Sequence, residues 1–331
     1  MPNPIKVAVL GFWHVHAADY ASQIRRHPDT ELVAVWDDDS ARGQSAAEAL
    51  DTSFVGDLDD LLIRDNVDAV TVTTATTQHR PIMISAANAG KHIFTEKLLA
   101  PTVAEAEEII GAADQADVAL VVSLPRLYHG YARAIVEELN QGRLGEPTHC
   151  RVRLSHDGAV AGWLPDRFYD SAAAVGGALS DLGCHPAYLT QLFLGASPAT
   201  VSATYGSYTK RRVEDQAVVT LGYDGGAIGV VETGFLSRDP FIIEIHGTQA
   251  SLAYESTENL LRMRDAGSDM WQPLAVAQDD QDPFAQWVTH IRNRTRADDN
   301  LTRAVDLSRL VSAANASAAT GTAVRYRIGA T

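Results

Sequence analysis

The feature that most constrains the fold is an alternation of short β-branched runs with alanine-rich helical patterns in the first part of the chain. The strand-like runs cover residues 5–10, 32–36, 69–73, 92–95 and 119–123. Between the first two runs, apolar side chains recur at the spacing of one helix face, at Ala17, Tyr20, Ala21 and Ile24. Strands separated by helices build a parallel sheet, because each crossover helix returns the chain to the same end of the sheet. The pattern therefore predicts a doubly wound α/β domain over residues 1–125.

Local capping signals support two of these helices. Ser40 is expected to cap a helix over residues 41–50. Thr102 and Glu105 match a capping box, which predicts that a helix begins there and runs to about residue 116.

A different pattern begins after the Gly145-Glu146-Pro147 turn. Longer runs that alternate apolar and polar residues are typical of strands with one buried face. They cover residues 148–155, 200–209, 216–223, 227–235 and 241–245, with a last strand at 323–328. Helical patterns lie at 177–194, 283–292 and 301–318, and the last two either pack on the sheet or return to the first domain. We predict an α+β domain over residues 126–331 with a large, mostly antiparallel sheet.

The composition limits the class of protein. Its 331 residues, 46% of them hydrophobic, suit two globular domains. With 42 acidic against 27 basic residues the net charge is −15, which disfavours nucleic acid and anionic membrane surfaces as partners. Cys150 and Cys184 are too far apart in sequence for a disulfide framework or a zinc site, so no metal is expected. Because no run reaches the roughly 18 apolar residues of a membrane span and the start shows no signal peptide, we expect a cytoplasmic protein.

The turn after the first strand has features of a dinucleotide site. Backbone N–H groups that follow Gly11 can hold a pyrophosphate at the start of a helix. The G-x-G-x-x-G fingerprint is incomplete, because the chain reads Gly11-Phe12-Trp13-His14-Val15-His16 and keeps only the first glycine. Phe12 and Trp13 are expected to line the coenzyme loop beside Gly11. The alternative is a tight turn in a generic α/β domain.

The end of the second strand bears on the choice of coenzyme. Asp37 stands where an acidic side chain accepts hydrogen bonds from the adenosine ribose, and its charge repels a 2′-phosphate. This favours NAD, whereas the nearby Arg42 keeps NADP as an alternative. Asp37, Asp38 and Asp39 could instead form only a solvated acidic turn.

Three residues form a candidate acid–base set. Lys97, next to Glu96, follows the 92–95 strand at the sheet edge where ligands of this architecture bind, and it can hydrogen-bond a reacting oxygen. Asp181 and His185 lie four residues apart, so on one helix the aspartate could orient the histidine as a general base. The alternatives are a solvated Glu–Lys pair and a histidine that belongs to the core.

In their order along the chain, these motifs resemble the Gfo/Idh/MocA oxidoreductases, a family that includes glucose–fructose oxidoreductase and inositol dehydrogenase. The resemblance covers nearly the whole chain and rests on the strand–Gly11–helix turn, Asp37, Thr74 with His79, residues 89–92, Glu96-Lys97, residues 142–145 and residues 176–185. It implies a Rossmann domain that binds NAD or NADP, with Thr74, His79 and Glu96 among its coenzyme residues. It also implies a second domain whose open-faced sheet supplies substrate contacts and a subunit interface, so that a homodimer or homotetramer is expected.

The family's motifs fall on this chain with departures. Its Glu-Lys-Pro motif falls on Glu96, Lys97 and Leu98, so that the proline is lost, and its Thr-Pro-Asn stretch keeps only the threonine. Its active-site aspartate and histidine fall on Asp181 and His185, with Lys97 as the third member.

The predicted function is hydride transfer between NAD(P) and a secondary alcohol or ketone of a sugar, sugar derivative or cyclitol. His185 would take the hydroxyl proton, Asp181 would orient the imidazole of His185, and Lys97 would donate a hydrogen bond to the reacting oxygen. Alternatively, the proton passes to Lys97. Substrate contacts are expected from loop residues, namely Arg126, His129, Trp163, Arg167 and Tyr169.

Two other functions stay open. An NAD-dependent glycosidase would oxidise a sugar hydroxyl transiently, eliminate the aglycone and then reduce the product. A nucleotide-binding sensor would bind the coenzyme without turnover, although the acid–base set argues against it, because a sensor needs no such set.

Overall fold

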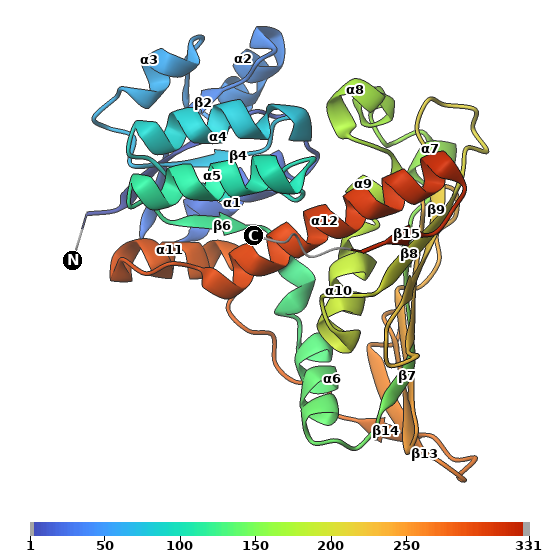
Figure 1. Ribbon diagram of the computed structural model, residues 1–331. Coiled ribbons are helices and arrows are strands. Elements are labelled where there is room, and N and C mark those ends of the chain that lie inside the picture. Colours follow the sequence, from blue (N-terminus) through green and yellow to red (C-terminus); the bar gives the residue numbers. More distant parts are fainter. Residues whose placement is uncertain (1–2, 327–331) are drawn as a thin grey trace. The chain divides into compact units, whose positions relative to one another are not determined.

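The computed structural model describes residues 3–326, which form two compact units (Figure 1). The first unit comprises residues 3–124 and 281–308, and the second comprises residues 125–280 and 309–326. Sequence reasoning placed a domain boundary at residues 125/126 and left two destinations open for the C-terminal helices. The segment 281–308 folds with the N-terminal sheet, although it is far from that sheet in sequence.

The first unit is built on a six-stranded parallel sheet. Its strands are β1 (Ile5–Leu10), β2 (Thr30–Trp36), β3 (Ser53–Phe54), β4 (Ala69–Val72), β5 (His92–Thr95) and β6 (Leu120–Val122). They are ordered β3-β2-β1-β4-β5-β6, and every neighbouring pair is parallel. This is the order of a dinucleotide-binding doubly wound sheet, so the predicted α/β fold is confirmed.

The helices of this unit begin largely where the sequence predicts. They are α1 (Ala17–Arg26), α2 (Ser40–Ala49), α3 (Leu58–Leu62), α4 (His79–Asn88, after a 3-10 turn at Thr76–Gln78), α5 (Val103–Gln115), α11 (Pro283–Asn293) and the first part of α12 (Asp298–Thr320). Thr102 caps α5 as predicted, since its hydroxyl accepts a hydrogen bond from the N–H of Glu105 at 3.2 Å.

The cap of α2 differs from the prediction. Its N-cap is Asp39, whose carboxylate accepts hydrogen bonds from the N–H groups of Ala41 and Arg42 at 3.0 and 3.1 Å, and Ser40 is the first helical residue. The physical reason is that a carboxylate both caps these N–H groups and interacts favourably with the helix dipole.

Helices cover both faces of the parallel sheet. Strand order reverses between β1 and β4, so right-handed crossovers place α1 and α2 on one face and α4 and α5 on the other. Figure 1 shows α4 and α5 side by side along the sheet. The carboxyl ends of β1 and β4 meet at this reversal, which is where doubly wound sheets bind their ligands.

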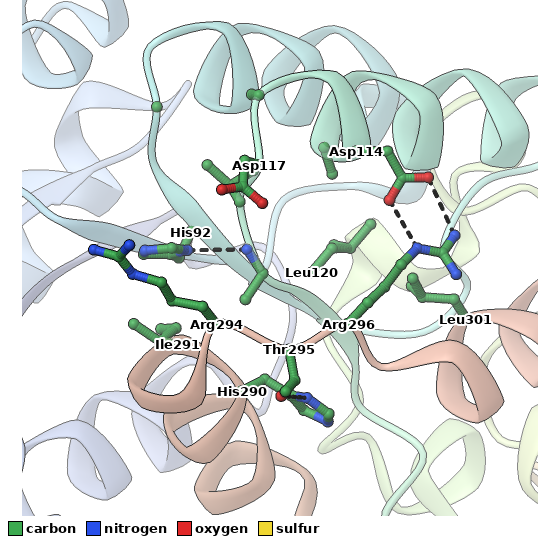
Figure 2. A pocket seen from close by; sticks show the side chains of 15 residues that line it. His92, Asp114, Asp117, Leu120, His290, Ile291, Arg294, Thr295, Arg296 and Leu301 are labelled. Atoms are coloured by element: carbon green, nitrogen blue, oxygen red, sulfur yellow. Dashed lines mark hydrogen bonds and ion pairs between the residues drawn. The ribbon is translucent and has the colours of Figure 1, made fainter.

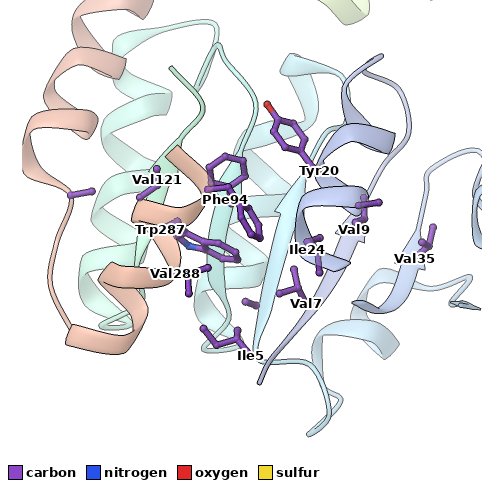
Figure 3. Packing of buried hydrophobic residues seen from close by; sticks show 14 of the residues in the cluster. Ile5, Val7, Val9, Tyr20, Ile24, Val35, Phe94, Val121, Trp287 and Val288 are labelled. Carbon is purple, nitrogen blue, oxygen red and sulfur yellow. The ribbon is translucent and has the colours of Figure 1, made fainter. Parts of the chain in front are cut away.

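A buried core fills the space between the sheet and α1 and α11 (Figure 3). Side chains of β1 alternate between the two faces, so that Val7 and Val9 point into this core. The buried residues of α1 are those predicted from its spacing, Ala17, Tyr20, Ala21 and Ile24. Trp287 of α11 has no exposed surface, and its ring centroid lies 5.7 Å from that of Phe94 on β5.

The second unit is built on a nine-stranded sheet. Its strands are β7 (Pro147–Ser155), β8 (Thr200–Gly206), β9 (Gln216–Gly222), β10 (Ile228–Gly234), β11 (Ile242–Gly247), β12 (Ala250–Glu255), β13 (Leu260–Asp265), β14 (Gln272–Leu274) and β15 (Val324–Arg325). They are ordered β14-β13-β12-β11-β7-β10-β9-β8-β15; β7 and β10 are parallel and the other neighbours are antiparallel. The predicted mostly antiparallel sheet is confirmed, although β12 to β14 were not predicted. Of the strand predicted at 323–328, residues 327 and 328 lie outside the described residues.

One predicted helix of this unit is divided. The helices are α6 (Gly130–Asn140), α7 (Gly158–Ala161), α8 (Ser171–Ala174), α9 (Ala178–Asp181) and α10 (Cys184–Leu194), with 3-10 turns at Pro125–Leu127 and Asp166–Tyr169. The helix expected over residues 177–194 is interrupted at Leu182 and Gly183. Pro186 explains the break, because proline lacks an N–H and clashes inside a helix but is tolerated in a first turn. Asp181 and His185 therefore lie on two helices.

The two faces of the nine-stranded sheet differ. α10 packs against β7 and β10 on one face. On the other face, Val218 and Ile228 are 46% and 47% exposed, and Arg151 bridges Glu232 and Glu244 at 2.8 and 3.0 Å. The prediction of an open-faced sheet is thus confirmed. Within residues 3–326, no helix has the length and apolar character that crossing a membrane would require.

Candidate active site

The turn between β1 and α1 requires glycine at its first position. Gly11 has φ +88°, and a Cβ there would lie 2.6 Å from Cγ2 and 2.9 Å from Cα of Thr74. The backbone of β1 thus approaches the end of β4 as closely as a pyrophosphate turn needs. Trp13 and His14 are both buried, in the part of the loop where the fingerprint has its second glycine. The loop keeps the turn of a dinucleotide site but fills it with ring side chains.

Asp37 is enclosed by hydrogen bonds from the protein itself. Its side chain has no exposed surface and accepts from the N–H of Phe12 at 2.6 Å and from two nitrogens of Arg42 at 2.6 and 2.9 Å. Asp38 is 35% exposed and accepts from Nε2 of Gln78 at 3.0 Å. Of these two carboxylates, Asp38 is therefore the more accessible to a ribose, and sequence reasoning did not select it.

Thr74 and His79 have different surroundings at the end of β4. The Thr74 hydroxyl oxygen is buried and has no hydrogen-bond partner in the described part of the chain. A ligand hydroxyl or phosphate would supply one, so this atom fits a coenzyme at the carboxyl edge. Nδ1 of His79 instead lies 2.9 Å from the carbonyl oxygen of Leu98, and burial lowers the pKa of His79, so it acts as a neutral donor that holds the loop after Lys97.

Glu96 and Lys97 form a buried ion pair where β5 ends. Nζ of Lys97 lies 3.6 Å from Oε2 of Glu96, and the Lys97 N–H donates to the same oxygen at 2.9 Å. The hydroxyl of Tyr20 donates to the other carboxylate oxygen. Burial by itself raises the pKa of Glu96, but the charges of Lys97, His14 and His16 outweigh it and lower that pKa from 4.5 to about 2. Glu96 is therefore a fixed anion that favours the charged form of Lys97.

This ion pair predicts an acid-dependent loss of stability. Because the pKa of Glu96 is lowered in the folded protein, its stabilising effect is present above about pH 4.5 and is lost as the pH falls toward about 2. We expect Glu96→Gln to reduce the free energy of unfolding near neutral pH by on the order of 3 kcal/mol, and to have much less effect near pH 2. Urea unfolding of both proteins across this range measures the difference. The exposed Glu107→Gln is the control, and an equal loss at both ends of the range would contradict the assignment.

His14, His16 and Glu96 place three possible metal-ligand atoms within 4.8 Å of one another. Two neighbours oppose a bound cation. The charged Nζ of Lys97 lies 3.6 Å from the Glu96 carboxylate, and Nδ1 of His14 accepts a hydrogen bond from the His16 N–H at 3.3 Å. We therefore assign no metal to this cluster.

A pocket of about 540 Å³ lies at the opposite edge of the same sheet, where β5 and β6 begin (Figure 2). His92 and Leu120 line it from the strands, and Arg294 and Arg296 line it from the segment after α11. Arg296 pairs with Asp114 through two hydrogen bonds of 2.8 and 3.2 Å. Because ligands of doubly wound sheets bind at the carboxyl edge, this pocket is not where the coenzyme is expected.

In the second unit, a buried glutamate holds the segment that carries Asp181. Oε2 of Glu214 accepts from the N–H of Gly177 at 2.9 Å, and Oε1 accepts from the N–H of Leu179 at 3.0 Å. A Cβ on Gly177 would lie only 2.0 Å from the Glu214 carbonyl oxygen, so glycine is required for this approach. Burial raises the pKa of Glu214, and the N–H groups that it caps work against that rise. The double glycine at 176–177 therefore serves close packing at the start of α9.

His185 is buried at the first turn of α10. Its Nδ1 lies 2.8 Å from the hydroxyl of Tyr188, whose oxygen also accepts the backbone N–H of Arg126 at 3.1 Å. Asp181 lies at the end of α9, and its charge works against the lowering of the His156 pKa that burial causes. Asp181, His185 and His156 thus belong to the same region of the second unit.

The five predicted substrate residues do not all meet. Arg126 and Trp163 line one pocket of about 470 Å³ with Leu154, Ser155, His156, Asp157, Arg238, Asp239, Phe241 and Ser256. The Trp163 indole is 52% exposed, and its N–H donates to Asp157 at 3.1 Å. His129 lies at the start of α6, with Nδ1 3.2 Å from Asp279. Tyr169 packs beneath the Arg211 guanidinium, and Arg167 lies over the Phe168 ring.

Comparison with known proteins agrees with this architecture. Residues 5–124 match the family described as "Oxidoreductase family, NAD-binding Rossmann fold", and residues 132–253 match the "GFO/IDH/MocA C-terminal domain". The chain belongs to the Gfo/Idh/MocA family. It is 30% identical to 1,5-anhydro-D-fructose reductase of Ensifer adhaerens over 230 residues, and these cover 67% of each chain. It is 28% identical over 235 residues to dTDP-3,4-didehydro-2,6-dideoxy-alpha-D-glucose 3-reductase of Streptomyces antibioticus, which is 71% of this chain and 70% of that one. The crystal structure of an oxidoreductase domain protein from Kribbella flavida has a TM-score of 0.83 and 25% identity, and covers 98% of this chain and 100% of that one.

The resemblance inferred from the sequence motifs is thus confirmed. As a member of the Gfo/Idh/MocA family, the chain is an oxidoreductase that acts on CH–OH groups, and its first unit carries the NAD(P)-binding Rossmann domain. Sequence reasoning missed four residues of the candidate site, namely Asp38, His156, Tyr188 and Glu214. Only Asp38 had a visible signal, its position in an acidic run after β2.

Proposed function

We propose that the protein transfers a hydride between NAD(P) and a secondary alcohol or ketone of a neutral sugar, sugar derivative or cyclitol. The observation that carries this substrate class is the pocket of the second unit in which the exposed Trp163 lies beside two guanidinium groups and two carboxylates. An indole packs on the C–H face of a sugar ring, and polar groups around it bind hydroxyls. Because Arg126 and Arg238 balance Asp157 and Asp239, the pocket suits a neutral polyol better than an anion.

Two observations support a link between this pocket and the acid–base residues. The charge of Asp181 acts on His156 in the pocket. The backbone of Arg126, which also lines the pocket, donates to Tyr188, and Tyr188 contacts His185. A substrate held by Arg126 would therefore lie close to the surroundings of His185.

The chain's residues supply proton handling. A bound nicotinamide would supply the hydride-transfer chemistry. Lys97 and His185 act on the reacting oxygen, one by exchanging its proton and the other by donating a hydrogen bond. Glu96 favours the charged form of Lys97. We expect Asp181 to orient the imidazole of His185.

We propose NAD as the preferred coenzyme. Asp37, Asp38 and Asp39 surround the single guanidinium of Arg42, so the region expected to face the ribose has excess negative charge. That charge repels a 2′-phosphate, and Asp38 is the carboxylate that we expect to accept the ribose hydroxyls. Titration of the apoprotein with NADH and NADPH should show tighter binding of NADH, and tighter binding of NADPH would contradict the assignment.

Trp163→Ala tests the sugar pocket. Loss of the stacking face is expected to raise KM for the substrate about 2- to 10-fold, equivalent to about 0.5–1.5 kcal/mol, with little change in kcat. Steady-state kinetics at saturating coenzyme measures both constants. Trp271→Ala, which removes an indole outside this pocket, should leave KM unchanged; an unchanged KM in Trp163→Ala would contradict the proposed stacking.

A substrate panel tests the function itself. The protein is incubated with NAD and inositols, aldoses or glycosides, and with NADH and keto sugars, while the absorbance of the reduced coenzyme is followed. Turnover of a neutral polyol or its ketone is the expected result. Glycoside cleavage with retained NAD and no net release of NADH would identify the glycosidase instead. Tight NADH binding without turnover across the panel would favour the sensor.

We further propose that the protein acts in the cytoplasm as a homodimer or homotetramer joined through the open face of the nine-stranded sheet. Both cysteines are buried and neither forms a disulfide, which suits a reducing compartment. The exposed Val218 and Ile228 beside the Arg151 ion pairs resemble the mixed apolar and charged surface of a subunit interface. Sedimentation velocity measures the state, and a monomer at micromolar concentration would contradict this proposal.

A further inference from the structure

The surroundings of the Tyr188 hydroxyl determine where its hydrogen points. Tyr188 is 2% exposed, and within the described residues its oxygen has two hydrogen-bonding neighbours, the Arg126 N–H at 3.1 Å and Nδ1 of His185 at 2.8 Å. The backbone N–H of Arg126 can only donate, so it occupies a lone pair of the phenol oxygen. The phenolic hydrogen then has one acceptor, which is Nδ1 of His185.

The protonation state of the phenol agrees with this geometry. Burial raises the pKa of Tyr188 well above its ordinary value, although Arg126 works against the rise. The side chain therefore keeps its hydrogen over the working pH range. A buried hydroxyl that donates to no acceptor costs free energy of folding, so the orientation in which the phenolic hydrogen points to His185 is favoured.

We propose that Tyr188 is a positioning residue that fixes neutral His185 in the tautomer with its hydrogen on Nε2. A carboxylate on Nδ1 would accept a hydrogen there and leave Nε2 as a base, whereas Tyr188 donates to Nδ1 and makes Nε2 a donor. His185 then gives a hydrogen bond to the reacting oxygen. The inference deepens the proposed function and rests on it for this catalytic role.

Lys97 then exchanges the proton of the reacting oxygen. In reduction, the ammonium of Lys97 gives its proton to the carbonyl oxygen while the carbonyl carbon accepts a hydride with its electron pair from the reduced nicotinamide, so that the C=O double bond becomes a C–O single bond with new O–H and C–H bonds. Oxidation is the reverse, which begins from the deprotonated amine and returns the proton to it. Glu96, 3.6 Å from Nζ, stabilises the ammonium that results. The Tyr188 hydroxyl is uncharged, so this contact by itself does not stabilise a protonated His185.

The same geometry gives Arg126 two roles in the second unit. Its side chain lines the sugar pocket and lies 4.5 Å over the Phe241 ring, while its backbone N–H holds the Tyr188 hydroxyl. The residue expected to touch the substrate thus also sets the direction of the hydrogen that determines the His185 tautomer.

Long-range proton–nitrogen correlation spectra of the full chain labelled with ¹⁵N-histidine test the tautomer directly. The signal of His185 among the 11 histidines is identified by its absence in His185→Gln. At neutral pH we expect the Nε2–H pattern in the wild type, and a mixture with a substantial Nδ1–H fraction in Tyr188→Phe. Tyr205→Phe, which removes a hydroxyl bonded to Asn315 at 2.6 Å in the same unit, should leave the His185 pattern unchanged. An Nδ1–H or doubly protonated His185 in the wild type, or an unchanged pattern in Tyr188→Phe, would overturn the proposal.

Kinetics form the second readout. We expect Tyr188→Phe to lower kcat about 10- to 100-fold, the range seen when an orienting partner of a metal-bound histidine is removed, with KM little changed and the pH profile of kcat displaced. A merely structural role would leave the pH profile unmoved, which would overturn the inference. Because the spectra need no turnover, a failure of the proposed substrate class and a failure of the tautomer assignment are distinguishable.

Discussion

Lys97→Ala is expected to lower kcat by about 10²- to 10⁴-fold, the range typical of losing a group that transfers a proton in the transition state. Its Nζ is held 3.6 Å from the ionised Glu96 at the end of β5, and 3% of its side chain is exposed, so bulk water cannot easily take its place. The rate is measured from the absorbance of the reduced coenzyme at saturating substrate and coenzyme. Coenzyme affinity is measured separately by fluorescence titration, which separates a binding defect from a chemical one.

The chain offers a matched control for this substitution. Lys210 is an exposed lysine in the second unit, and Lys210→Ala should retain normal kcat. Added small primary amines should restore part of the lost rate in Lys97→Ala if the side chain transfers a proton. Near-normal kcat in Lys97→Ala would remove Lys97 from the mechanism.

Trp287→Ala is expected to reduce the free energy of unfolding by about 3–5 kcal/mol, the usual cost of truncating a large buried aromatic side chain. Trp287 has no exposed surface, lies between Phe94 and Phe284 at 5.7 and 5.5 Å, and donates from its indole to the Ala119 carbonyl at 3.3 Å. Domains are typically stable by only about 5–15 kcal/mol, so this loss is a large fraction of the total. Urea unfolding followed by circular dichroism measures it.

Trp163→Ala is the control for Trp287→Ala. It removes the same side chain from a position that is 52% exposed, so its stability change should stay within about 0.5 kcal/mol, while its effect appears in KM. A small loss of stability in Trp287→Ala would mean that the segment 281–308 contributes little to the core of the first unit.

Elements with strong local signals were predicted from the sequence. The strands and helices of the first unit alternate so regularly that the doubly wound sheet follows from periodicity and crossover handedness. β13 and β14 were missed because their residues lack a clean alternation; Leu260–Asp265, for instance, mixes leucine, methionine and arginine. β12 was missed although its residues alternate between buried and half-buried positions. The helix over residues 177–194 was predicted as continuous because its apolar pattern outweighed Pro186, which in fact marks a new first turn.

Hydrogen-bond partners in the candidate site were harder to predict. Asp37 stands at the predicted strand end, but its carboxylate accepts hydrogen bonds from Phe12 and Arg42. For this reason we propose Asp38, and not Asp37, as the ribose contact. Glu214 was invisible because nothing in its local sequence shows that it caps the start of α9 from 35 residues away.

By itself, the sequence determined the two sheet types, the glycine turn after β1 and the placement of Lys97 at the end of a parallel strand. These depend on periodicity and on residues that are neighbours in the chain. Only the tertiary structure decided that the segment 281–308 completes the first core, that Arg42 encloses Asp37, and that the partner of His185 Nδ1 is Tyr188. The physical reason is that a side chain's hydrogen-bond partner depends on which backbone and side-chain atoms the fold places beside it, as the Arg126 N–H lies beside the Tyr188 oxygen. The spacing of residues along the chain does not specify such contacts.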